Sequence, residues 1–142
     1  WYDFWENQPL AGPQHLELTL PLERLPLFVR GDSILPLAPP ADFVGQKPWQ
    51  PITLEVRVGS RAAVSFANPD EPVEVRAEAR EGGLALDISA ADQLLEIRFL
   101  APARFGDIQF SGAIAEADWE QKDGLALARL RAQGRGRVMA KT

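Results

Sequence analysis

The sequence predicts an all-β protein whose antiparallel strands pack as β-sandwiches. Apolar and polar residues alternate with a period of two along several segments, as in strands that bury one face and expose the other. Turn-forming residues separate these segments at intervals of about 8–12 residues, a spacing typical of sandwiches. The 12 prolines among 142 residues disfavour long helices, because proline lacks a backbone N–H group. The best helical candidates are short: the stretch 113–119, or a turn at 90–93.

The predicted strands follow one another along the chain. In the first, Leu16, Leu18 and Leu20 alternate with polar residues, and the same pattern recurs at 52–58, 73–79, 84–88 and 95–99. Turns are predicted where glycine, proline, asparagine and aspartate interrupt these patterns. They lie at Gly12–Pro13, Gly31–Asp32, Pro39–Pro40, Asn68–Pro69, Gly82–Gly83 and Asp123–Gly124. Arg30-Gly31-Asp32 is interpreted as a hairpin turn after a strand, and Gly134 and Gly136 predict a turn between two final strands.

A change in composition divides the chain near residue 72. Residues 1–72 are rich in proline and aromatic residues, whereas residues 73–142 are rich in alanine, arginine and glutamate. The segment 68–72, with sequence NPDEP, is the best linker candidate, because its prolines interrupt strand pairing. The length fits one ordinary domain or two small β-domains, and this change in composition marks 1–72 and 73–142 as the two parts if there are two.

The overall composition narrows the partners that we expect. The formal net charge of −5 makes the surface repel phosphate backbones, which argues against nucleic acid as a partner. No apolar run reaches the length of about 18 residues that a membrane helix needs, so no membrane partner is expected. There is no cysteine, which excludes a disulfide framework and is compatible with the cytoplasm, the compartment that we favour. Because the sequence starts at Trp1 without an initiator methionine, we expect it to be a piece of a longer protein.

Residues that could carry chemistry are few. His15 is the single histidine, so neither a zinc site nor a catalytic triad can be built on it. Asp70-Glu71 and Asp118-Trp119-Glu120 are interpreted as solvated surface, since Asp and Glu are mostly exposed. A C-terminal stretch with Arg129, Arg131, Arg135 and Arg137 is expected to be a solvated face as well. The sequence therefore predicts no catalytic residue, no metal site and no cofactor.

Two segments of the first forty residues resemble a known family. WYDFW at Trp1–Trp5 and PLERLPLFVRGDSILPL at Pro21–Leu37 are similar to the region just after the catalytic barrel of glycoside hydrolase family 31, the α-glucosidases and α-xylosidases. The sequence departs from the family pattern at 6–8, where the family usually has Thr-Gly-Glu, at Glu23, where Asp is commoner, and at 31–33. Many α-glucosidases of the family carry Tyr-Glu-Asp-Asp-Gly further along. The segment 58–72 lacks this motif, and bacterial α-xylosidases of the family lack it too. This absence favours an α-xylosidase-like parent.

The resemblance implies a supporting role within a larger enzyme. In this family a proximal and a distal β-sandwich follow the barrel, which implies two small antiparallel β-sandwich domains here, the proximal at 1–72 and the distal at 73–142. The family's barrel carries the two carboxyl groups of retaining hydrolysis. The chain is therefore expected to be the non-catalytic C-terminal portion of a carbohydrate-processing hydrolase. Its partners would be the catalytic barrel of the parent chain and, through it, an oligosaccharide substrate, and the domains could also help to assemble a homo-oligomer.

The aromatic cluster at the N-terminus leaves two interpretations open. The rings of Trp1, Tyr2, Phe4 and Trp5 could pack against the barrel, because aromatic side chains bury about 150–250 Å² each and make strong anchors. They could also stack on sugar rings, which makes Trp1 and Trp5 the candidate substrate-binding residues. Packing is the preferred interpretation. The alternatives to a glycosidase tail are a carbohydrate-binding module and a stand-alone structural β-sandwich.

Overall fold

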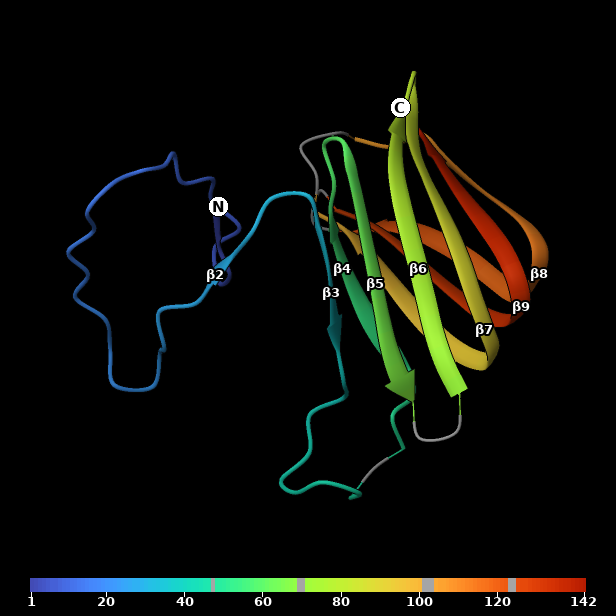
Figure 1. Cartoon of the computed structure of the whole chain (residues 1–142), viewed down its shortest axis with the longest axis horizontal. Coiled ribbons are helices and arrows are strands. Elements are labelled where there is room, and N and C mark those ends of the chain that lie inside the picture. Colours follow the sequence, from blue (N-terminus) through green and yellow to red (C-terminus); the bar gives the residue numbers. More distant parts are fainter. Residues whose placement is uncertain (47, 69–70, 101–103, 123–124) are drawn as a thin grey trace. The chain divides into compact units, whose positions relative to one another are not determined.

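The protein is built from strands throughout the residues that the structure describes. The computed structural model describes residues 1–46, 48–68, 71–100, 104–122 and 125–142, and no helix occurs in these ranges. In them the chain forms no long apolar helix that could cross a membrane. The predicted all-β class is therefore confirmed. The chain divides into two compact units, Trp1–Gly31 and Asp32–Thr142, here called the N-terminal unit and the C-terminal unit (Figure 1).

The N-terminal unit is held by one short strand pair. Strand β1 (Tyr2–Asp3) pairs antiparallel with β2 (Phe28–Val29), and the Phe4 N–H donates to the Leu27 carbonyl at 2.9 Å. The predicted strand over 16–20 is wrong, because this segment has no strand and leaves Leu16 and Leu18 exposed. Alternation alone does not make a strand, since the segment also needs a neighbouring edge to pair with.

The C-terminal unit is a single seven-stranded sheet. Its order is β3-β4-β7-β6-β5, and β9 pairs with both β7 and β8. Among the described strands the pairing is antiparallel except between β4 and β7, which run parallel. The strands are β3 (Ser33–Leu37), β4 (Ile52–Arg57), β5 (Arg61–Asn68), β6 (Glu71–Arg80), β7 (Gly83–Phe99), β8 (Asp107–Lys122) and β9 (Leu125–Lys141).

The sheet folds over itself because three long strands bend. The pairing of β7 with β9 shifts register between Ala90 and Gln93, and that of β8 with β9 shifts after Gly112 and again after Ala115. The two halves of each strand thus belong to different layers, and Figure 1 shows β7, β8 and β9 curving sharply and returning behind. The result is a sandwich made from one continuous sheet.

Glycines make this bend possible. Gly112 and Gly134 have φ angles of 78° and 146°, which L side chains rarely adopt. The predicted turn at Gly134 and Gly136 is wrong because β9 bends there and continues to Lys141. The helical candidates 113–119 and 90–93 are also wrong, since these residues belong to β8 and β7.

The core lies between the two layers of the C-terminal unit. The predicted strands at 52–58 and 73–79 correspond to β4 and β6, and those at 84–88 and 95–99 are the two halves of β7. The apolar members of each alternating set point inward, and the Phe99 and Phe105 rings meet edge to face at 5.2 Å. The largest fully buried apolar side chains are Phe99, Ile52, Leu54, Leu86, Ile88, Leu95, Ile97, Leu130, Val56, Val73 and Val75.

The predicted turns have mixed outcomes. Gly82 lies between β6 and β7 with a φ of 76°, as a turn glycine should. Arg30-Gly31-Asp32 is not a hairpin turn, because β2 pairs with β1 and β3 pairs with β4. The turns expected at Asn68–Pro69 and Asp123–Gly124 include residues outside the described ranges.

The predicted domain boundary falls within a strand. Residues 72 and 73 both belong to β6, which pairs with β5 from Asn68↔Glu71 to Arg61↔Glu78. Part of the linker candidate 68–72 lies outside the described residues. The division into domains 1–72 and 73–142 stays a prediction.

Candidate functional site

The predicted substrate-binding residues Trp1 and Trp5 lie in the N-terminal unit, and Trp5 lies in a turn organised by Asp3. The Asp3 carboxylate accepts the backbone N–H groups of Trp5 at 2.9 Å and Glu6 at 2.8 Å. Such a local side-chain bond fixes a turn in the absence of regular structure. Arg24 lies across this turn, 3.4 Å from Asp3 and 3.0 Å from Glu6. Arg24, in the segment 21–37, therefore fixes the turn that follows the start of the segment 1–5.

Trp5 is fixed by contacts within this unit. Its Nε1–H donates to the Leu25 carbonyl at 2.8 Å, and its ring meets the Phe4 ring at 5.1 Å with an interplanar angle of 87°. The Arg24 guanidinium lies 5.9 Å from the centre of the Trp5 ring, within the range of a cation–π contact. Trp5 is still half exposed, but its Nε1–H group and part of its ring are already in contact with other residues of this unit.

Trp1 is the more available of the two candidates. Its side chain is 61% exposed and borders a groove of about 370 Å³. The other residues that line this groove are Leu10, Ala11, Gly12, Pro13, Gln14, Leu16 and Phe28. The lining offers apolar contact rather than hydrogen bonds, so it suits an apolar side chain or the face of a sugar ring.

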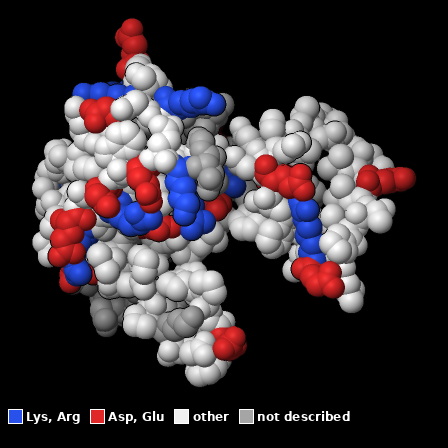
Figure 2. Space-filling model, turned by 180° about the vertical axis from the view of Figure 1, so that it is seen from behind, with Lys and Arg blue, Asp and Glu red and all other residues white. Residues whose placement is uncertain are grey.

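The N-terminal unit exposes an unusual amount of apolar surface. Leu22 is 98% exposed and Leu25 68%, and the visible surface of this unit is mostly uncharged in Figure 2. Its other large exposed apolar residues are Trp1, Trp5, Leu16, Leu18, Leu27 and Phe28. Exposed apolar patches of this kind mark surfaces that another protein segment or a ligand covers.

The other predicted surface residues lie on the outside. His15, Asp118 and Glu120 are exposed, and Asp70 lies outside the described residues. Arg129 forms an ion pair with Glu120 at 2.8 Å. Figure 2 shows basic and acidic side chains interspersed over the face of the C-terminal unit that it draws. Within the described ranges, no three His, Cys, Asp or Glu side chains come together in a way that could hold a metal. That the chain has no catalytic residue of its own stays a prediction.

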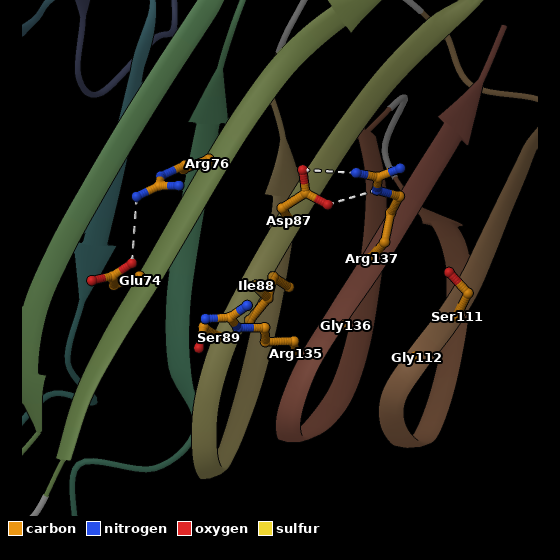
Figure 3. A pocket seen from close by; sticks show the side chains of 10 residues that line it. All are labelled: Glu74, Arg76, Asp87, Ile88, Ser89, Ser111, Gly112, Arg135, Gly136 and Arg137. Carbon is orange, nitrogen blue, oxygen red and sulfur yellow. Dashed lines mark hydrogen bonds and ion pairs between the residues drawn. The ribbon is translucent and has the colours of Figure 1, made fainter.

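A second hollow, of about 560 Å³, lies in the C-terminal unit and was not predicted from the sequence. Figure 3 shows its charged side chains on β6, β7 and β9. The Arg137 guanidinium donates two hydrogen bonds to Asp87, at 2.6 and 3.0 Å, and these lower the pKa of that carboxyl below its ordinary value. Single charged residues in alternating strands gave no signal in the sequence, because only the strand register brings them together.

The comparisons with known proteins agree with the resemblance. Residues 1–35 match the family model described as "Glycosyl hydrolase family 31 C-terminal domain". An α-xylosidase from Saccharolobus solfataricus is 31% identical over 70 residues, which are 49% of this chain and 10% of that protein. The resemblance to the C-terminal region of glycoside hydrolase family 31 is therefore confirmed.

Solved structures share the fold. A crystal structure of an uncharacterized protein from Listeria monocytogenes EGD-e, in complex with α-D-glucose, β-D-glucose, magnesium and calcium, matches 99% of this chain with a TM-score of 0.73 and 15% identity. A second structure of that protein gives 0.75 and 13%. The chain spans 16% of the Listeria protein, as it spans only a small part of the α-xylosidase.

Proposed function

We propose that the chain is the non-catalytic C-terminal portion of a retaining α-glycosidase, and that it supports the catalytic barrel of that enzyme. An α-xylosidase is favoured over an α-glucosidase, because the curated relative is an α-xylosidase and the segment 58–72 lacks the acidic run typical of many α-glucosidases. The parent would remove terminal α-linked sugars through two carboxyl groups about 5–5.5 Å apart. Both carboxyl groups would lie on the barrel.

The apolar surface of the N-terminal unit carries this proposal. The family match falls on residues 1–35, and Leu22 and Leu25, the most exposed apolar residues of this unit, lie inside it. Burial of apolar area stabilises by about 25 cal/mol per Å², so leaving leucines in water has no benefit for a free-standing unit. A barrel wall that covers them explains why the matched segment presents its leucines outward.

The activity test compares this chain with the longer protein in the source cells. An antiserum against the chain should detect a band well above 15.7 kDa, because a barrel alone adds roughly 250 residues. The purified longer protein should release sugar from aryl α-xylosides, whereas the 142-residue chain should release none. Turnover by the pure chain, or a native product of the chain's own size, would refute the proposal.

A paired variant tests the docking surface itself. Leu22→Asn should leave the unfolding midpoint of the isolated chain nearly unchanged, because the side chain is already in water. In the longer protein the same change should lower the melting temperature, since it places an amide in an apolar interface. If the melting temperature of the longer protein does not move, Leu22 is not covered by the barrel.

Carbohydrate binding is the second candidate function, and the exposed Trp1 beside its groove favours it. It predicts saturable binding of xylo- or gluco-oligosaccharides to the isolated chain, measured by calorimetry and lost in Trp1→Ala. Absence of heat at millimolar sugar would rule out this function.

A further inference from the structure

The hollow on the outer face of the C-terminal unit is built by strand register. Arg76, Asp87, Arg137 and Ser111 lie opposite one another across β6, β7, β9 and β8. Glu74, Ser89 and Arg135 form the neighbouring row. Adjacent strands lie about 4.8 Å apart, so Glu74, Ser89 and Arg135 lie within about 10 Å on three neighbouring strands, whereas Ser111 lies across β9, beside Gly112 and Gly136 (Figure 3).

The three arginines of this hollow differ in what holds them. Arg137 is fixed on Asp87 by two hydrogen bonds. Arg76 is only loosely paired, 3.6 Å from Glu74, and both side chains are more than half exposed. The Arg135 side chain makes no hydrogen bond or ion pair with any residue that the structure describes, and Figure 3 shows it beside Ser89, its partner in the β7–β9 pairing. A guanidinium in this position can donate two parallel hydrogen bonds to a carboxylate.

The charge and shape of the hollow define the class of ligand. Three arginines and two carboxylates, Glu74 and Asp87, give a formal charge of +1 (3 − 2), which one negative charge neutralises. A phosphate dianion would leave an excess negative charge beside these carboxylates. The volume of about 560 Å³ lies within the range of about 300–1,000 Å³ of small-molecule sites. No aromatic ring lines the hollow, so hydrogen bonds must recognise the ligand, and a polyhydroxylated molecule offers them to the Ser89 hydroxyl and to Glu74.

We propose that this hollow binds a sugar acid of the hexuronate type, with its carboxylate on Arg135 and its hydroxyl groups on Ser89 and Glu74. The site lies in the C-terminal unit and does not depend on the proposed glycosidase function. In a longer carbohydrate-active protein it would hold an acidic sugar by a site that contributes no catalysis.

Calorimetry on the full chain tests the ligand class. Sodium glucuronate should bind saturably in the millimolar range at fixed ionic strength, whereas glucose at the same concentration should not bind and inorganic phosphate should bind more weakly. No saturable binding of glucuronate would overturn the proposal. Equal binding of glucose, or tighter binding of phosphate, would overturn the choice of a sugar carboxylate.

A pair of arginine variants tests the location. Arg135→Gln should weaken glucuronate binding about tenfold, because it removes a charged hydrogen-bond donor. Arg129 lies on the same strand but outside this hollow. The variant Arg129→Gln should therefore bind glucuronate as tightly as the unchanged chain does. Both arginines are exposed, so circular dichroism should show an intact fold in both variants. Unaltered binding in Arg135→Gln, or equal loss in both variants, would overturn the assignment to this hollow.

Discussion

Asp32 shows how one side chain can stabilise a turn that lies far along the chain. Its Oδ1 atom accepts the backbone N–H groups of Gly59 and Ser60, both at 2.7 Å, and these residues form the turn between β4 and β5. Its own φ angle is 51°, which Asp and Asn tolerate better than most residues. In the sequence Asp32 was part of a supposed hairpin turn, and nothing local could reveal partners 27 and 28 residues away.

Asp32→Ala should destabilise the chain by about 1–2 kcal/mol. The change removes both hydrogen bonds to the turn and leaves alanine at a positive φ. Asp32→Asn keeps the Oδ1 acceptor and the tolerance for this φ, so it should lose less than half as much. Urea denaturation of the three proteins measures the difference. Equal losses in both variants would mean that the charge, rather than the turn contact, matters.

Asp87 should make stability depend on acid pH. Arg137 lowers the pKa of Asp87 in the folded chain, so this carboxylate stabilises the fold above its unfolded pKa of about 4. That contribution is lost as the pH falls through the lowered folded pKa. Because the Asp87 side chain is 53% exposed, the effect should stay below about 1 kcal/mol.

Comparison of Asp87→Asn with the unchanged chain isolates this effect. The difference in unfolding free energy should be present at neutral pH and shrink below about pH 4, where Asp87 is protonated first in the unfolded chain, and it should vanish below the lowered folded pKa. Glu81→Gln, in the exposed turn before β7, removes the same charge without a strong pair and serves as the control. A difference that stays constant down to the most acidic pH measured would contradict the assignment.

At the scale of the elements, the sequence predicts the strands well where apolar and polar residues alternate along a straight strand, because successive side chains then point to opposite faces of the sheet. The segments 52–58 and 73–79 follow this rule and became β4 and β6. It fails where a strand bends, because β9 reads as two strands with a glycine turn between them. It also fails at 16–20, where the alternation is present and a partner strand is not. Register and partner choice are non-local, so the charged hollow could not be predicted either.

The bend in β8 should depend on the glycine at position 112. A Cβ atom on Gly112 would lie 2.6 Å from the Arg135 carbonyl oxygen, and the φ there is 78°. Gly112→Ala should therefore cost about 2–3 kcal/mol, the sum of overpacking and backbone strain. Gly106→Ala is the control, because no atom lies within 4 Å of its added Cβ and its φ is ordinary. Equal thermal stability of the two variants would show that β8 does not need glycine at the bend.

At the scale of the whole molecule, the two units differ in the internal contacts that stabilise each of them. The C-terminal unit has long paired strands around a core of buried Phe99, Leu86 and Ile97. The N-terminal unit has two strands of two residues each and several side-chain contacts around Asp3 and Trp5. A unit with so little buried apolar surface is expected to open at a small cost in free energy.

Hydrogen exchange on the full chain should reveal this difference. Amides in 83–99 and 125–141 lie in paired strands beside the core and should exchange only when the C-terminal unit opens. Amides in 10–27 belong to no described strand and should exchange faster by several orders of magnitude, since each 1.4 kcal/mol of opening free energy is a factor of about ten. Equal protection of both regions would mean that the N-terminal unit is stable on its own and needs no barrel to cover it. Protection of 10–27 that appears only in the longer protein would instead identify the N-terminal unit as the part that the barrel stabilises.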